Sequence, residues 1–149
     1  MKKILFISSS GGHWIQMRRL EKALPKDFKR FFISTDAGHA SQFPGGNYFH
    51  VPDASRTSKV GLLVCAAKVL ACLLIIRPDV VITTGAAPGF FALFFARKLG
   101  KKTIWLDSIA NVRELSLSGQ KAGKYADLWL TQWPQVSSPN GPEYHGAIL

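Results

Sequence analysis

The residues that could do chemistry gather where apolar runs end. The first group is SSSGGH, residues 8–13, which follows an apolar run and precedes a segment of helical character. Glycines let a backbone approach an oxyanion closely, and the N–H groups of a helix start point toward such a ligand. Ser10, Gly11 and Gly12 are therefore predicted to bind an anionic group, with His13 beside it. Because the spacing is not G-x-G-x-x-G, no nicotinamide cofactor is expected.

A second group repeats this pattern. TTGAAPG, residues 83–89, follows another apolar run and places Gly85 ahead of a second helical segment. If the two runs are neighbouring strands, the two turns form one cleft lined with backbone amides. The competing interpretation of both turns is ordinary strand-to-helix geometry, in which His13 is a partly exposed polar residue without a chemical role.

The third group lies in WLDSIANVRELSLSG, residues 105–119. A carboxylate at the end of a strand is well placed to act as a general base, so Asp107 is a candidate alongside His13. Capping of its own loop is the alternative role for Asp107. Asn111 and Arg113 add polar groups that could bind an anion, and a solvated arginine is equally compatible with the pattern. The other histidines lack the spacing of a metal site, so neither a metal nor a cofactor is expected.

The elements that position these groups alternate along the chain. Strands are predicted at 3–8, 31–34, 48–51, 80–83, 103–106 and 128–131, and helices at 14–24, 59–76, 88–99 and 118–125. Continuous apolar strands that alternate with helices indicate a parallel sheet covered on both faces. We therefore expect an α/β fold with a single Rossmann-like, doubly wound sheet of about six strands. Residues 1–133 form this domain, and residues 134–149 form an irregular tail that could dock a partner.

Charge narrows the classes of function. The 149 residues correspond to one domain, and 19 Lys and Arg against 9 Asp and Glu give a formal charge of +10. Such an excess favours an anionic partner, either a phosphate-bearing substrate or an acidic lipid surface. No nucleic acid is expected, since the basic residues are not interleaved with exposed aromatic residues. Arg18, Arg19 and Lys22 are predicted to face a membrane, with a solvated helix face as the alternative.

The most apolar segment is KVGLLVCAAKVLACLLIIR, residues 59–77. Its length borders on that of a transmembrane span, but the sheet needs a crossover helix at this point. We expect a domain helix whose outer face contacts lipid, with Lys59 and Lys68 reaching toward headgroups. Cys65 and Cys72 lie two turns apart on this helix, too far for a disulfide, which fits buried thiols in a reducing cytosol. The first apolar run is too short for a signal peptide.

Several motifs, taken in order, resemble a known family. They are SSSGGH, RPDVVITTGAAPGFFALFFARKLG, DSIANVRELSLSG, ADLWLTQWPQV and YHGAIL. Together they resemble the acceptor-side subunit of the split N-acetylglucosaminyltransferase of the dolichol pathway and its bacterial PssD-type relatives in exopolysaccharide synthesis. The first motif is also similar to the glycine-rich acceptor loop of MurG, the peptidoglycan glycosyltransferase.

The resemblance implies the N-terminal half of a GT-B glycosyltransferase that is split over two chains. This half is expected to bind a polyprenyl-pyrophosphate-linked sugar while lying peripherally on an anionic membrane surface, at its inner, cytoplasmic face. A second Rossmann-like chain is expected to bind the UDP-sugar, whose sugar is N-acetylglucosamine, a uronic acid or a hexose. Without that donor-binding partner the chain is expected to be inactive, and with it the transfer inverts the sugar.

The sequence departs from the family pattern at two places. Eukaryotic relatives carry an N-terminal membrane anchor where this chain runs from residues 1–3 directly into its first strand. Family members commonly have glutamate and Ala-Arg where this chain has Asp107 and Ala110-Asn111, which bears on Asp107 as the base.

Two rival functions are compatible with the sequence. The first is a non-catalytic scaffold that recruits a separate catalytic subunit to the membrane. The second is a stand-alone nucleotide-binding protein.

Overall fold

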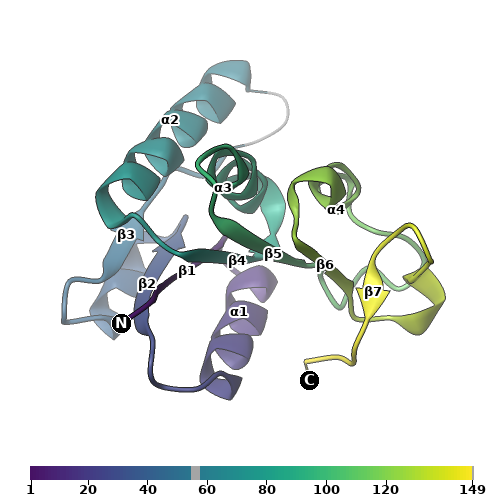
Figure 1. The fold of residues 1–149 in the computed structure, drawn as a ribbon. Coiled ribbons are helices and arrows are strands. Elements are labelled where there is room, and N and C mark those ends of the chain that lie inside the picture. The colour runs from purple at the N-terminus through teal and green to yellow at the C-terminus, as the bar shows by residue number, and fades with distance from the viewer. Residues whose placement is uncertain (55–57, 149) are drawn as a thin grey trace.

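The computed structural model describes residues 1–54 and 58–148, and this part of the chain forms one parallel sheet of seven strands (Figure 1). The strands are β1 (Lys3–Ser8), β2 (Lys29–Ser34), β3 (Tyr48–His50), β4 (Val80–Gly85), β5 (Lys102–Leu106), β6 (Leu128–Thr131) and β7 (Glu143–Tyr144). The helices are α1 (Gly12–Ala23), α2 (Lys59–Ile76), α3 (Ala86–Lys98) and α4 (Leu117–Ala122), and the 3-10 turns are η1 (Ala37–Gln42), η2 (Gly123–Tyr125) and η3 (Pro134–Val136).

The strand order is β3-β2-β1-β4-β5-β6-β7. The chain thus builds the sheet outward from β1 in one direction and then from β4 in the other. This reversal confirms the predicted Rossmann-like, doubly wound sheet. In such sheets, ligands bind at the carboxyl ends of the two strands between which the order reverses. Here those strands are β1 and β4, which carry the two glycine-rich turns.

Side chains of β1 alternate between two apolar layers. Leu5 and Ile7 belong to the core beneath α2 and α3, whereas Ile4 and Phe6 belong to the core beneath α1. Helices α2, α3 and α4 therefore cover one face of the sheet, and α1 covers the other (Figure 1). The alternation follows from the two-residue period of a strand that is buried on both faces.

Several boundaries differ from the sequence prediction by one to three residues, and two helix starts show a clear cause. Helices α1 and α3 begin at Gly12 and Ala86, each two residues earlier than predicted, because glycine precedes each helix with φ of +80° at Gly11 and +130° at Gly85. Those backbone conformations are open to glycine and turn the chain at once from strand to helix. The C-terminal tail, expected to be irregular, contributes β7, which pairs in parallel with β6 through two residue pairs. A pairing this short leaves no periodicity in the sequence.

Helix α2 spans the predicted residues but is unusual for a crossover helix. By length and composition alone it could cross a membrane. Only 28% of it is buried, which is little for a helix that packs on a sheet. Cys65 and Cys72 are on its buried side, and both are free thiols, as predicted. Its remaining surface is exposed to solvent and largely apolar.

The two thiols should therefore be unreactive in the folded protein. Burial raises the pKa of Cys65 to about 11, with a further contribution from the nearby Asp53 carboxylate, and burial also raises the pKa of Cys72. Since the thiolate is the nucleophile, neither residue should react with a dithiobis(nitrobenzoate) reagent at pH 8, where a free cysteine is partly ionised. After unfolding in guanidinium, both thiols should react and release two equivalents of thionitrobenzoate per chain. Native labelling at the rate of free cysteine would contradict this packing.

Candidate functional site

The site lies where α1 and α3 begin, at the carboxyl ends of β1 and β4. No side chain caps the first turn of either helix, whereas Ser58 and Ser116 cap α2 and α4. The backbone N–H groups at the start of α1 and α3 consequently lack a side-chain acceptor. Uncapped helix starts present N–H donors and the positive end of the helix dipole to a ligand. Two of them on adjacent strands form a surface suited to an anion.

His13 bridges the two turns. Its Nδ1 lies 2.9 Å from the carbonyl oxygen of Thr84, and the Thr84 hydroxyl donates to the carbonyl oxygen of His13 at 2.6 Å. A carbonyl oxygen can only accept, so Nδ1 carries the proton and Nε2 of the neutral ring has a free lone pair. The ring is half-buried. His13 is thus held in the tautomer that can accept a proton at Nε2.

Gly85 makes this placement of the ring possible. A Cβ atom at Gly85 would lie 2.9 Å from both Nδ1 and Cε1 of His13, and the backbone φ of +130° also disfavours any side chain. The next residue, Ala86, has a φ of +66°, a conformation uncommon for a residue other than glycine. Backbone strain of this kind is frequent at binding sites. The structure therefore brings together His13 and Gly85, as the sequence predicted.

Among the small residues of the first turn, Ser10 has a different environment from the glycines. Its backbone N–H donates to the Thr35 hydroxyl at 3.0 Å, and its own hydroxyl accepts from Thr35 at 3.3 Å. Ser10 thus attaches the turn to the end of β2, and its amide is already used. Gly11 and Gly12 are exposed, and a Cβ at either would meet nothing within 4 Å. Within the first turn, the backbone amides available to an anion are therefore those of Gly11, Gly12 and His13.

Asp107 is not placed to act as a general base. Its side chain is buried, and its carboxylate accepts four hydrogen bonds. Oδ1 accepts from the Trp105 indole N–H at 3.0 Å and the Ser116 hydroxyl at 2.7 Å, and Oδ2 accepts from the Asn111 amide at 2.9 Å and the Ser116 backbone N–H at 3.0 Å. Four bonds use all the lone-pair positions of a carboxylate. The geometry corrects the base prediction and matches the loop-capping alternative.

Asn111 and Arg113, the other residues of this loop predicted to bind an anion, make no hydrogen bond to the β1 or β4 turn among the residues that the structure describes. Asn111 is engaged with Asp107, and Arg113 is exposed without an ion pair in the part of the chain that the structure describes. Asn111 and Arg113 both line a shallow depression on the loop, and neither His13 nor Gly85 is among the residues that line it. Gly119 is also explained by Asp107, because a Cβ there would lie 2.4 Å from Oδ1. The LSLSG motif thus has a structural role in closing the loop over the carboxylate.

Two buried glutamines that the sequence analysis did not single out connect this loop to the rest of the site. The Gln16 side-chain oxygen accepts from the Ile109 N–H at 3.1 Å and from the Gln132 amide at 2.7 Å. Gln132 also donates to the Asp107 carbonyl oxygen at 3.0 Å and accepts from the Ile148 N–H at 2.8 Å. The sequence did contain a signal for Gln16. It lies on α1 between the apolar residues Trp14 and Met17, and all three are buried in the structure.

The five residues predicted to face a membrane do not form one surface. Arg18, Arg19 and Lys22 lie on α1, and Lys59 and Lys68 lie on α2, on the opposite face of the sheet (Figure 1). Arg18 is moreover engaged within the protein, with an ion pair to Glu21 at 3.1 Å and cation–π contacts to Phe32 and Phe43. Successive crossovers on opposite faces of the sheet separate the two groups.

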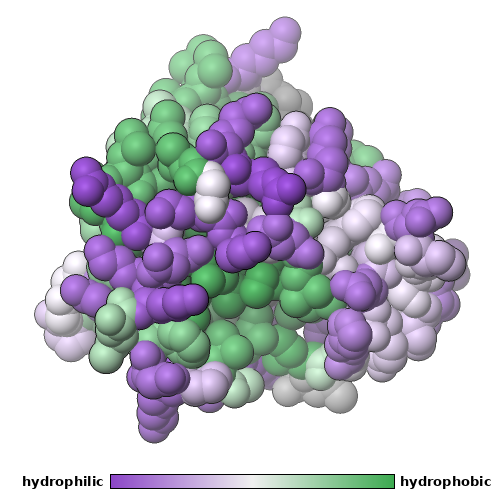
Figure 2. Space-filling view, in the orientation of Figure 1, coloured by the Kyte–Doolittle hydropathy of each residue, from purple (hydrophilic) through white to green (hydrophobic). Residues whose placement is uncertain are grey.

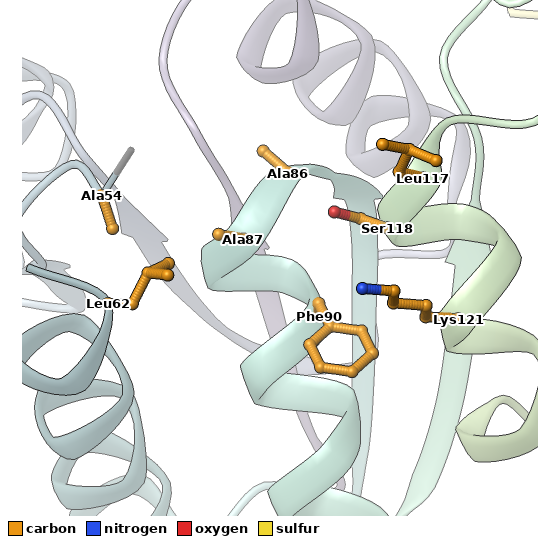
Figure 3. Close-up of a pocket in the computed structure, with 8 residues that line it drawn as sticks. All are labelled: Ala54, Leu62, Ala86, Ala87, Phe90, Leu117, Ser118 and Lys121. Atoms are coloured by element: carbon orange, nitrogen blue, oxygen red, sulfur yellow. The ribbon is translucent and has the colours of Figure 1, made fainter. Parts of the chain in front are cut away.

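An open cleft of about 390 Å³ lies over the start of α3, between α2 and α4 (Figure 3). Ala86, Ala87 and Phe90 of α3 form its floor. Because Ala86 directly follows Gly85, the cleft begins beside the turn that contacts His13.

The family model described as "Oligosaccharide biosynthesis protein Alg14 like" matches residues 49–148, which is more than half of the chain. The chain belongs to the Alg14-like family. Its relative from Yarrowia lipolytica, a UDP-N-acetylglucosamine transferase subunit, is 25% identical over 177 residues that cover 99% of this chain and 81% of the relative. The corresponding subunit from Schizosaccharomyces pombe is 34% identical over 77 residues, 48% of this chain and 37% of that protein. The resemblance inferred from the motifs is therefore confirmed for the N-acetylglucosaminyltransferase subunits, and its extension to bacterial PssD-type proteins stays a prediction.

Solved structures support the same fold. Acinetobacter baumannii MurG superposes with a TM-score of 0.71 at 12% identity over 95% of this chain. A UDP-N-acetylglucosamine 2-epimerase from Listeria monocytogenes superposes with a TM-score of 0.70 at 15% identity over 91% of this chain. The Alg14-like chain covers 45% of the MurG chain and 40% of the epimerase chain. At these identities the likeness is one of fold, to the GT-B type of domain.

The Asp107 network predicts a large effect on stability. In Asp107→Asn, an amide group replaces one acceptor oxygen and faces donors, so buried hydrogen bonds are lost. We expect the free energy of unfolding to fall by about 3 kcal/mol, measured by urea unfolding followed by tryptophan fluorescence. Glu114→Gln, an exposed carboxylate of the same loop, is the matched control and should change it by less than about 0.5 kcal/mol. Equal stability of the two variants would contradict the four-bond geometry.

Proposed function

We propose that this chain is the acceptor-binding subunit of a two-chain, inverting glycosyltransferase. The observation that carries the proposal is the pair of uncapped turns after β1 and β4, with His13 held between them, in a member of the Alg14-like family. A second chain supplies the donor half of the cleft and binds the UDP-sugar. N-acetylglucosamine is the donor sugar we favour, since both curated relatives are named as subunits of a transferase for it.

The acceptor in this proposal is a polyprenyl-pyrophosphate-linked sugar. The free N–H groups of Gly11, Gly12 and His13 bind a pyrophosphate oxygen at the positive end of α1. The charge of +10 favours approach of this anionic substrate. The sugar then lies above the carboxyl ends of the strands, where its hydroxyl group can face a donor bound to the second chain.

His13 acts as the general base. Its free Nε2 lone pair takes the proton of the acceptor hydroxyl while the hydroxyl oxygen attacks the anomeric carbon of the donor. The bond from the anomeric carbon to the UDP phosphate oxygen breaks on the opposite side, UDP leaves with the electron pair, and the configuration inverts. Throughout the step the Thr84 carbonyl oxygen accepts from Nδ1–H, which holds the ring in place in both its neutral and its protonated form.

The two rival functions differ from this proposal in measurable ways. A scaffold that only recruits a catalytic subunit would not need the Nε2 atom of His13. A stand-alone nucleotide-binding protein would bind a UDP-sugar without a second chain. In the proposed enzyme the isolated chain binds UDP-sugars only weakly, because the donor site belongs to the partner.

Substitution of His13 tests the proposal. In the complex with the donor-binding chain, His13→Ala should lower kcat for sugar transfer by at least about a hundredfold, because the general base is lost. Formation of the complex, measured by size-exclusion chromatography, should not change. His50→Ala, an exposed histidine at the end of β3, is the control and should transfer normally. Wild-type turnover by His13→Ala would favour the scaffold, and tight UDP-sugar binding by the isolated chain would favour the nucleotide-binding protein.

We further propose that α2 attaches the chain peripherally to the cytoplasmic, inner face of a membrane. Most of the outward residues of α2 are apolar, and they recur at helical spacing: Val60, Leu63, Val64, Ala67, Ala71, Leu74 and Ile75. Leu63 and Ile75 are each 70% exposed. Figure 2 shows apolar surface gathered over the part of the molecule where Figure 1 draws α2. Lys59 and Lys68 are exposed on the same helix, within reach of anionic headgroups.

Membrane attachment can be tested on this outward face. The double variant Leu63→Glu with Ile75→Glu should bind vesicles containing one-third phosphatidylglycerol at least about tenfold more weakly, since each apolar side chain contributes about 1.5 kcal/mol or more when buried in lipid. Cosedimentation with the vesicles measures the change. Leu99→Glu, at the end of α3 and also exposed, should bind like the wild type. Unchanged binding of the double variant would remove α2 from the proposal.

A further inference from the structure

The cleft over the start of α3 combines apolar walls with a cation (Figure 3). Ala87 and Phe90 form the floor, Leu62 of α2 lies on one side, and Ser118 and Lys121 of α4 lie on the other. Its volume of about 390 Å³ is within the range of small-molecule sites. A surface of this composition suits a ligand with an apolar body and an anionic end.

Lys121 is available to such a ligand. It is exposed, and it makes no ion pair or hydrogen bond with any residue that the structure describes. In Figure 3 its Nζ extends from α4 over the cleft toward α3, below the Ser118 hydroxyl. Two other cations of this face are already engaged, since Lys124 lies over the Tyr125 ring and Arg97 pairs with Asp127.

The two ends of the cleft connect different parts of the molecule. At one end, Leu62 belongs to α2 and is next in the chain to Leu63, one of the outward apolar residues. At the other end, Ala86 follows Gly85, against which the His13 ring packs. The cleft therefore runs from the apolar helix to the anion-binding turns. A long amphiphile bound there would have its apolar part toward α2 and its polar end toward His13.

We propose that this cleft binds the isoprene units nearest the pyrophosphate of the acceptor, and that Lys121 and Ser118 bind the lipid-side phosphate. The sugar-side phosphate then reaches the amides of Gly11, Gly12 and His13. This inference rests on the proposed function and assigns to it a lipid path along the α2, α3 and α4 face of the sheet. Lys121 becomes a specificity-determining residue, because it distinguishes an isoprenoid pyrophosphate from an uncharged isoprenoid.

The test is a titration of the purified full chain with farnesyl pyrophosphate by isothermal calorimetry. Lys121→Gln should weaken binding about tenfold, because a hydrogen bond between charged groups is lost. Binding of farnesol, which lacks the phosphates, should be weak and unaffected by this substitution. Ala87→Phe, which fills the floor of the cleft, should weaken both ligands. Lys124→Gln removes the same charge three residues further on and should change the Kd less than about twofold.

Three outcomes would overturn the inference. They are no binding of farnesyl pyrophosphate by the wild type, equal binding by Lys121→Gln and the wild type, or equally tight binding of oleoyl lysophosphatidate, which would make the cleft a general site for lipid phosphates. A transfer assay with the partner chain separates this inference from the proposed function. If His13→Ala transfers normally but Lys121→Gln binds poorly, the cleft stands and the base assignment falls. If His13 is essential but Lys121→Gln keeps the wild-type Kd and acceptor KM, the cleft alone falls.

Discussion

Two hydrogen bonds between His13 and Thr84 join the turns that follow β1 and β4. These turns belong to segments 71 positions apart in the chain, and they meet because the strand order of the sheet reverses between β1 and β4. One bond fixes the His13 ring through its side chain, and the other fixes its backbone. The absence of a Cβ at Gly85 accommodates this connection, because a side chain there would meet the His13 ring.

A second buried network stabilises the loop beside these turns. The Asp107 carboxylate collects donors from the end of β5 and from the start of α4, while Gln16 and Gln132 attach the same loop to α1 and β6. Polar groups in such a network are stable only when each has a partner, because an unpaired buried donor or acceptor is costly. In the most specific motifs, LSLSG and TQWP, Ser116 and Gln132 thus position the loop, whereas Ser118 of LSLSG lines the open cleft.

The sequence predicted best what depends on local pattern. Helix α2 was placed at its observed residues because its apolar run is continuous, and the glycine-rich turns were recognised because only small residues tolerate such geometry. The role of Asp107 could not be decided in the same way. A carboxylate at a strand end fits both a base and a cap, and the choice depends on the Trp105 and Ser116 donors that converge only after folding. Likewise, the positions of Arg18 and Lys59 on opposite faces follow from the crossovers and not from charge spacing.

The hydrogen bond from the Ile148 N–H to Gln132 gives the C-terminal tail an influence beyond its own position. Gln132 donates to the Asp107 carbonyl oxygen and to Gln16, so the tail, the loop and α1 share one side chain. Any molecule that grips or displaces residues 143–148 changes the partners of that side chain. By thermodynamic linkage, the free energy that couples the tail to the loop containing Asp107 acts equally in both directions, so binding at the tail changes the ordering of the loop. A contact made at the tail, on the edge of the sheet, can thus alter the structure of the loop and of α1 close to His13.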